Sequence, residues 1–175
     1  LLCVARHAHA QRLLTAQLHS DAFLREYLAI TDGIPKNESG VIDAPIARLG
    51  TGAKRGVVSG GQRAVTHYRV ERIHNGRALI RLKLETGRTH QIRVHMASLG
   101  HPLLGDSLYH LSDTTNLFSR AALHAWKLKF HPPFPAGETT SGILSSIPCT
   151  ENAKKEISLE APLPEDFKKF YETIF

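Results

Sequence analysis

The chain has 175 residues, of which 42% are hydrophobic, and a formal net charge of +6 at pH 7. This length and composition suit one soluble domain with an ordinary apolar core. The chain lacks both the run of roughly 18 apolar residues that a membrane-spanning helix needs and the pattern of a secretion signal. Both classes are excluded, and we expect a cytoplasmic protein.

The basic charge favours a polyanionic partner, because neutralising phosphates releases counterions. Many basic proteins bind no nucleic acid, so charge alone decides little. Cys3 and Cys149 stand in unrelated contexts without the spacing of zinc ligands, and we expect two reduced thiols.

The first predicted element is a buried strand in the apolar run 1–6. Because the chain starts on Leu1 rather than Met, we expect the natural protein to extend upstream. Residues 8–18 carry leucines at helical spacing among alanines, which predicts a short amphipathic helix.

Extended segments are expected next at 26–31 and at 41–46, followed by a polar, glycine-rich loop at 50–61. Strands at 64–73 and 77–84 flank Asn75-Gly76, a dipeptide that supplies the positive φ angles of a type I′ turn. The two strands should therefore pair as a hairpin. In the second strand apolar residues alternate with basic ones, which predicts one buried and one basic face.

A helix is predicted from an N-cap at Thr89 to an end near Gly100. A further strand is expected at 121–130 and a closing helix at 167–175. Residues 139–155 are rich in Ser and Thr and read as a flexible insertion. Together these elements predict one α+β domain over 1–175, with a twisted, largely antiparallel sheet and flanking helices.

The segment 86–95 carries the densest chemistry, because a glycine turn there leads into a helix N-terminus. Free backbone N–H groups at such an end form an anion site, and Arg88, His90 and Arg93 add further donors. The anion is an RNA phosphate or a protein carboxylate; alternatively, the segment is an exposed helix cap with solvated charges.

The same segment, TGRTHQIRVH, followed by GHPLLGDSLY at 100–109, resembles the signature of the RluA-type pseudouridine synthases. Five shorter segments extend the resemblance over nearly the whole chain except 139–155; they are 25–29, 42–46, 64–68, 123–125 and 161–164. The resemblance implies an isomerase that converts uridines in ribosomal or transfer RNA to pseudouridine without a cofactor. A non-catalytic RNA-binding paralogue of the same fold is the alternative.

The family's catalytic aspartate belongs to an HRLD element that precedes an apolar strand, which 1–6 would match. No HRLD string occurs in this sequence. Because the chain has no initiator methionine, we expect the element just upstream of Leu1; a homologue that lacks the element is the less favoured alternative. The catalytic domain is then incomplete at its N-terminus, and the 175 residues alone are predicted to be inactive.

By the family pattern, Arg93 is the cation that pairs with this aspartate, and Tyr27 is the tyrosine that stacks on the target base. Judged without the family, Arg93 would be a surface arginine and Tyr27 a core residue. Four further residues are expected to contact the RNA backbone or to orient Arg93; they are Arg88, Thr89, His90 and Gln91.

Metal binding is not expected, because His90, His95 and His101 match no standard zinc spacing. Asp106 is a carboxylate inside the signature, but the family pattern gives it no nucleophilic role. The sequence shows no sign of a membrane partner or of an obligate protein partner, and we expect a monomer.

Overall fold

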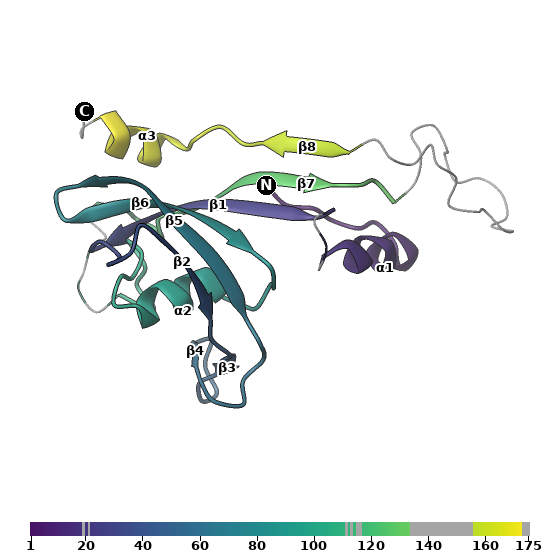
Figure 1. The fold of residues 1–175 in the computed structure, drawn as a ribbon, viewed down its shortest axis with the longest axis horizontal. Coiled ribbons are helices and arrows are strands. Elements are labelled where there is room, and N and C mark those ends of the chain that lie inside the picture. Colours follow the sequence, from purple (N-terminus) through teal and green to yellow (C-terminus); the bar gives the residue numbers. More distant parts are fainter. Residues whose placement is uncertain are drawn as a thin grey trace, which may run out of the picture.

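The computed structural model describes residues 1–18, 20, 22–110, 112, 114, 117–133 and 156–172. Its main feature is a six-stranded antiparallel sheet with the strand order β2-β5-β6-β1-β7-β8 (Figure 1). The strands, in that order, are Ser39–Asp43, Val65–His74, Arg77–Leu84, Leu24–Asp32, Leu123–Phe130 and Ile157–Glu160. A small separate hairpin joins β3 (Ile46–Arg48) to β4 (Arg55–Val57).

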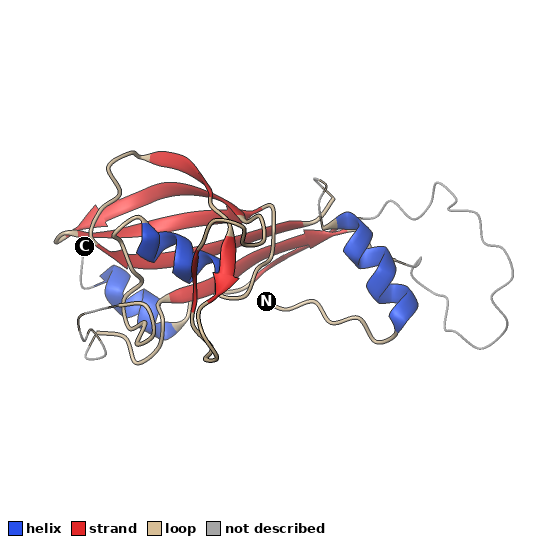
Figure 2. Ribbon diagram, turned by 90° about the horizontal axis from the view of Figure 1, so that it is seen from below, coloured by secondary structure: helices blue, strands red, loops and turns tan. Residues whose placement is uncertain are grey.

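Three helices accompany the sheet: α1 (Ala8–Gln17), α2 (Gln91–Ser98) and α3 (Glu165–Glu172). Figure 2 shows α1 at one end of the elongated sheet, far from α2. None of the three described helices has the length and apolar sequence needed to cross a membrane. The expected α+β architecture with a largely antiparallel sheet is confirmed.

The two faces of the sheet bury different apolar clusters because side chains alternate along each strand. On β1, Ala29 joins the cluster that contains Ile92 and Met96 of α2. Its neighbour Ile30 joins the cluster that contains Phe167 of α3. The two helices therefore cover opposite faces, and Tyr27, which packs against the first cluster, lies on the α2 face.

The predicted hairpin is confirmed, since β5 and β6 pair across Asn75 and Gly76, whose φ angles are 46° and 73°. The helix at 8–18 and the strands at 26–31 and 121–130 also match α1, β1 and β7. Segment 41–46 divides into the end of β2 and the start of β3, because the chain passes there from one sheet to the other.

The predicted strand at 1–6 is wrong. These residues form no strand, and Leu2 and Val4 are 85% and 72% exposed. The amino group of Leu1 donates to the carbonyl oxygen of Ala125 on β7 at 3.0 Å, but β7 already pairs with β1 and β8. An apolar run becomes a buried strand when a free strand edge is available, and β7 offers none here.

Three smaller expectations also need correction. The loop at 50–61 contains β4, which pairs with β3. The closing helix starts at Glu165 rather than at 167. Thr89 is not the N-cap of α2: that position is His90, in a left-handed conformation with φ 59° and without a capping side-chain hydrogen bond. The predicted insertion at 139–155 lies outside the described residues.

Candidate functional site

The most highly connected ion pair in the signature joins Arg93 of α2 to Asp106. Nε of Arg93 donates to Oδ2 of Asp106 at 2.7 Å, and Nη2 donates to Oδ1 at 2.6 Å. The aspartate side chain is fully buried, whereas 21% of the arginine side chain is exposed. Oδ1 also accepts hydrogen bonds from the backbone N–H groups of Leu108 and Tyr109 at 3.1 and 3.2 Å. This two-point geometry fixes the orientation of the guanidinium group.

Gly105 allows the chain to place Asp106 there. Its φ of 66° lies in the left-handed region, and a Cβ at this position would lie 2.2 Å from the carbonyl oxygen of Arg120. Both the backbone conformation and the space therefore require glycine.

Both members of the pair are charged at neutral pH. Burial by itself would raise the pKa of Asp106, but the hydrogen bonds and charge of Arg93, with the two backbone N–H groups, hold that pKa below its usual value. The hydrogen bond to Asp106 is the largest influence on Arg93 and raises the pKa of its guanidinium group. The arginine is thus a permanent cation beside the N-terminal end of α2.

Tyr109 connects this ion pair to His90. The guanidinium carbon of Arg93 lies 4.9 Å from the centre of the Tyr109 ring. The Tyr109 hydroxyl accepts from the backbone N–H of Arg55 at 3.0 Å and lies 2.9 Å from Nδ1 of His90. Burial and the charge of Arg93 lower the pKa of His90, so a neutral imidazole can accept the hydroxyl proton in a hydrogen bond.

Gln91 holds the turn before α2 against β5. Its side chain is buried, and Oε1 accepts from the backbone N–H of Arg88 at 2.9 Å and from the hydroxyl of Thr86 at 2.8 Å. Nε2 donates to the carbonyl oxygen of Val65 at 2.9 Å and to the hydroxyl of Thr66 at 3.0 Å. This network favours a positioning role for Gln91 over direct contact with RNA.

The other predicted contact residues lie near the same turn. Thr89 is exposed. Arg88 is half-buried, and its Nε donates to the carbonyl oxygen of Arg63 at 2.9 Å. The structure thus brings Arg88, His90 and Gln91 together with Arg93 around the start of α2.

Tyr27 occupies a different position, in the wall of a cavity of about 250 Å³ on the α2 face. Burial raises the pKa of its hydroxyl, which therefore stays protonated at neutral pH. Within the described part of the chain, no hydrogen bond, ion pair or ring contact joins Tyr27 to Arg93. Sequence reasoning had placed these two residues in one site.

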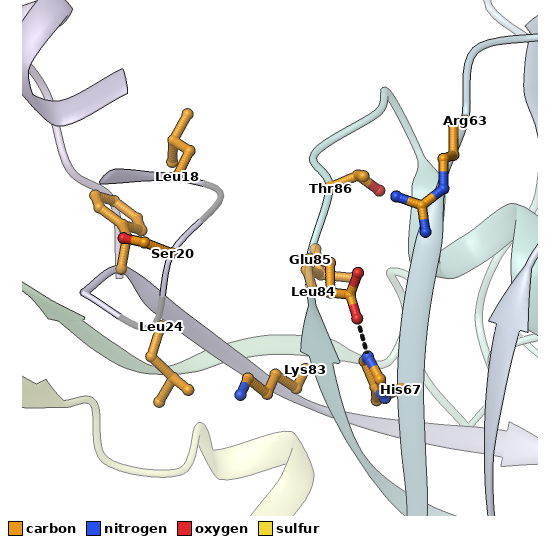
Figure 3. Close-up of a pocket in the computed structure, with 10 residues that line it drawn as sticks. Leu18, Ser20, Leu24, Arg63, His67, Lys83, Leu84, Glu85 and Thr86 are labelled. Carbon is orange, nitrogen blue, oxygen red and sulfur yellow. Dashed lines mark hydrogen bonds and ion pairs between the residues drawn. The ribbon is translucent and has the colours of Figure 1, made fainter. Parts of the chain in front are cut away.

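A second cavity, of about 540 Å³, opens between the α1–β1 connection and the adjoining ends of β5 and β6 (Figure 3). Arg63 and Lys83 contribute positive charge to its wall, and Nε2 of His67 lies 2.5 Å from a carboxylate oxygen of Glu85. The two cavities share Leu18 and Phe23 in their walls, so they are neighbours.

The histidines considered as metal ligands have separate surroundings. His95 is buried, with its ring nitrogens 2.9 Å from the Thr66 hydroxyl and 3.0 Å from the Ala44 carbonyl oxygen. Nδ1 of His101 lies against Gly33. Among the described residues, no group of three or more potential ligand side chains gathers.

Sequence reasoning gave no role to Tyr109 or Arg25, and it noted Asp106 without finding its partner. A carboxylate 13 positions after Arg93 is a visible signal, but the turn that brings the two together is not readable from spacing. Arg25 precedes Tyr27 by two positions, so the alternation of a strand could have placed both on one face.

The family model for RNA pseudouridylate synthase matches residues 1–98. A Bacillus subtilis relative, the uncharacterized RNA pseudouridine synthase YhcT, is 40% identical, with 98% of this chain covering 51% of that protein. Ribosomal large subunit pseudouridine synthase D of Zymomonas mobilis is 38% identical, with coverages of 99% and 52%. The chain therefore spans about half the length of these curated relatives.

Solved structures agree with this match. Human RNA pseudouridylate synthase domain containing 4 aligns with a TM-score of 0.61 at 25% identity over 90% of this chain and 63% of the human one. Human RNA pseudouridylate synthase domain containing 1 has the same fold, with a TM-score of 0.64 at 23% identity over 89% of this chain and 59% of that one. By its sequence match and its fold, the chain belongs to the RNA pseudouridylate synthase family.

Proposed function

We propose that this chain forms part of the catalytic domain of an enzyme that isomerises specific uridines in RNA to pseudouridine. The observation that carries the proposal is the orientation of Arg93 by Asp106 beside the N-terminal end of α2. Several relatives are named for ribosomal large subunit pseudouridine synthesis, so ribosomal RNA is the first substrate to test. Transfer RNA is the second.

The isomerisation moves the bond between base and sugar from a ring nitrogen to a ring carbon. The C1′–N1 bond breaks, the base rotates, and a C1′–C5 bond forms; C5 loses a proton and N1 gains one. Substrate and product contain the same atoms, so the overall reaction needs no external oxidant or reductant. The protein has to hold the detached base and stabilise the charges that develop.

In our proposal Arg93 supplies a fixed positive charge to this step. A guanidinium group has five N–H donors, and Asp106 occupies one on Nε and one on Nη2. Among the described residues, Nη1 has no hydrogen-bond partner. An incoming anion would therefore meet Nη1 and the second hydrogen of Nη2, and we propose that the catalytic aspartate of the family binds there.

The remaining site residues divide into two proposed roles. Tyr27 stacks on the target base, since its ring lines a cavity and its hydroxyl is uncharged. Arg88, Thr89 and His90 contact the RNA backbone around the start of α2, where backbone N–H groups favour an anion. Gln91 positions this turn from inside the protein.

The test is tritium release from RNA labelled at C5 of uridine, measured with the full-length protein. Arg93→Ala should lower turnover on the order of 10²- to 10³-fold, because a fixed charge is lost from the site. Tyr27→Phe keeps the stacking ring and removes the hydroxyl, so near-normal turnover indicates stacking and a large loss indicates proton transfer. Thermal unfolding of each variant controls for misfolding.

Wild-type protein that binds RNA but releases no tritium would contradict the isomerase proposal. That result would favour the non-catalytic RNA-binding paralogue. Arg93→Lys separates charge from geometry in the same assay: it keeps the cation but cannot hold Asp106 by a two-point contact.

A further inference from the structure

Arg25 is a half-buried cation that forms no hydrogen bond or ion pair with any described residue. It lies on β1 two residues before Tyr27, and both side chains line the 250 Å³ cavity. Nε of Arg25 is buried and has no hydrogen-bond partner among the described residues. The guanidinium carbon lies 5.8 Å from the centre of the Phe23 ring, and burial lowers the pKa of the group.

Gly87 lets the Arg25 side chain reach the turn before α2. A Cβ built at position 87 would lie 2.7 Å from Nη1 of Arg25. The guanidinium group therefore lies between the tyrosine cavity and the turn that carries Arg88 and Thr89. Arg25 thus connects the cavity that contains Tyr27 to the turn before α2. Among the described residues, no hydrogen bond, ion pair or ring contact joins Tyr27 to Arg93 on that helix.

Among the described residues, Arg25, Arg55 and Arg77 each have a buried side-chain nitrogen without a hydrogen-bond partner and form no ion pair, and Arg25 also lines the 250 Å³ cavity. Arg93, Arg81 and Arg120 each form an ion pair with a carboxylate. No ion pair in the described ranges includes Arg25. Removing a charge from water without a counter-ion is costly, so this position favours an anion supplied from outside the described residues.

We propose that Arg25 binds a phosphate of the RNA strand next to the nucleotide that stacks on Tyr27. This inference rests on the proposed function and adds a specific contact to it. The neighbouring 540 Å³ cavity carries Arg63 in its wall as a further cation. Lys83 also lines that cavity, but from the opposite face of the sheet, because its neighbour Leu82 is the register partner of Tyr27. A single carboxylate would neutralise Arg25 alone, whereas a strand with regularly spaced phosphates can reach both Arg25 and Arg63.

The first experiment measures binding of a single-stranded, uridine-containing RNA to the full-length protein by fluorescence anisotropy over a range of salt concentrations. Arg25→Gln should weaken binding about tenfold, since a charge-assisted hydrogen bond is lost. The slope of log K against log salt concentration should become shallower by about 0.7, the value for one phosphate on a single strand. Arg69→Gln is the matched control, because Arg69 is exposed on the face of the sheet opposite Tyr27; it should change neither quantity.

Gly87→Ala provides a second test that keeps every charge. The new methyl group should displace Nη1 of Arg25 and weaken RNA binding in the wild-type background. In the Arg25→Gln background it should have little further effect, which makes the two substitutions non-additive. Arg25→Lys should keep the salt slope and lose part of the affinity.

The outcomes separate this inference from the proposed function. Unchanged affinity and salt slope in Arg25→Gln, with wild-type RNA binding intact, would overturn the phosphate contact. If turnover fell in that variant while RNA binding stayed normal, Arg25 would instead pair with a protein carboxylate. Wild-type protein that binds no RNA would overturn the proposed function and this inference together.

Discussion

Replacing Asp106 by asparagine tests the ion pair on which the site is built. The substitution keeps the shape of the side chain but removes its charge. Oδ1 accepts from Nη2 of Arg93 and from the backbone N–H groups of Leu108 and Tyr109, so the amide oxygen would stay there. The amide nitrogen would then face Nε of Arg93, where two donors meet and no hydrogen bond forms.

The expected cost follows from this geometry. Breaking a buried ion pair by removing one partner costs about 3 to 5 kcal/mol. Arg93 is 21% exposed and regains some hydration, so we expect the lower end, about 3 kcal/mol of unfolding free energy. For a chain of this length, that corresponds to a fall in Tm of about 6 to 12 °C.

Urea unfolding at pH 7 measures this change, and Asp43→Asn is the matched control. Asp43 pairs with Arg63 at 3.2 Å, but the two side chains are 54% and 65% exposed. An exposed pair of this kind contributes about 0 to 1 kcal/mol. A loss below about 1 kcal/mol in Asp106→Asn would contradict the structural role that we assign to the pair.

The pH dependence of folding stability gives an independent check that the pKa of Asp106 is lowered in the folded protein. The pKa of Asp106 is lower in the folded than in the unfolded protein, so its contribution to stability is present above the unfolded pKa of about 3.9. That contribution is lost as the pH falls through the folded pKa. The stability difference between wild type and Asp106→Asn should stay constant from about pH 5 to 8 and shrink below about pH 4. A difference that stays constant down to about pH 3 would refute this explanation.

Two further predictions concern buried polar residues near α2. Gln91→Ala should lower the unfolding free energy by about 2 to 4 kcal/mol, because it leaves buried partners such as the Val65 carbonyl oxygen unsatisfied. Urea unfolding measures this change. An unchanged unfolding free energy would contradict the positioning role and favour direct contact between Gln91 and RNA. Burial lowers the pKa of His95, so the unfolded state binds more protons and wild-type stability should decline as the pH falls through about 6.5. His95→Gln should remove that decline, and an identical pH profile in this variant would contradict the assignment.

Turn residues, helical spacing and strand alternation in the sequence predicted those elements whose conformation depends mainly on neighbouring residues. Asn75-Gly76 fixed the β5–β6 hairpin because a type I′ turn needs two positive φ angles. The helical spacing of Ile92, Met96 and Leu99 predicts one apolar stripe on the helix; Ile92 and Met96 do pack on the sheet, whereas Leu99 lies at the end of α2 and is 41% exposed. Alternation along β6 predicted a buried side that includes Ile80, Leu82 and Leu84, as observed.

Errors arose where the outcome depends on distant parts of the chain. The run at 1–6 has the composition of a buried strand, but the neighbouring β7 pairs on both edges. Thr89 has the chemistry of an N-cap, yet the network of Gln91 holds the turn so that His90 takes the position before the helix. A local sequence pattern predicts neither whether a strand edge is free to pair nor which tertiary hydrogen bonds form, because both depend on residues distant in the sequence.

The contrast between Arg93 and Arg25 shows what the tertiary structure adds to the functional interpretation. In the sequence both are arginines inside recognisable segments, and the family pattern gave a role to Arg93 alone. In the structure Asp106 holds Arg93, so the anion that we propose to bind there would approach from the Nη1 side and meet a fixed orientation. Arg25 has no such counter-ion among the described residues, so we expect it to gain more from a ligand that supplies one. Loss of orientation at Arg93 should therefore lower turnover more than RNA affinity, whereas loss of Arg25 should lower RNA affinity first.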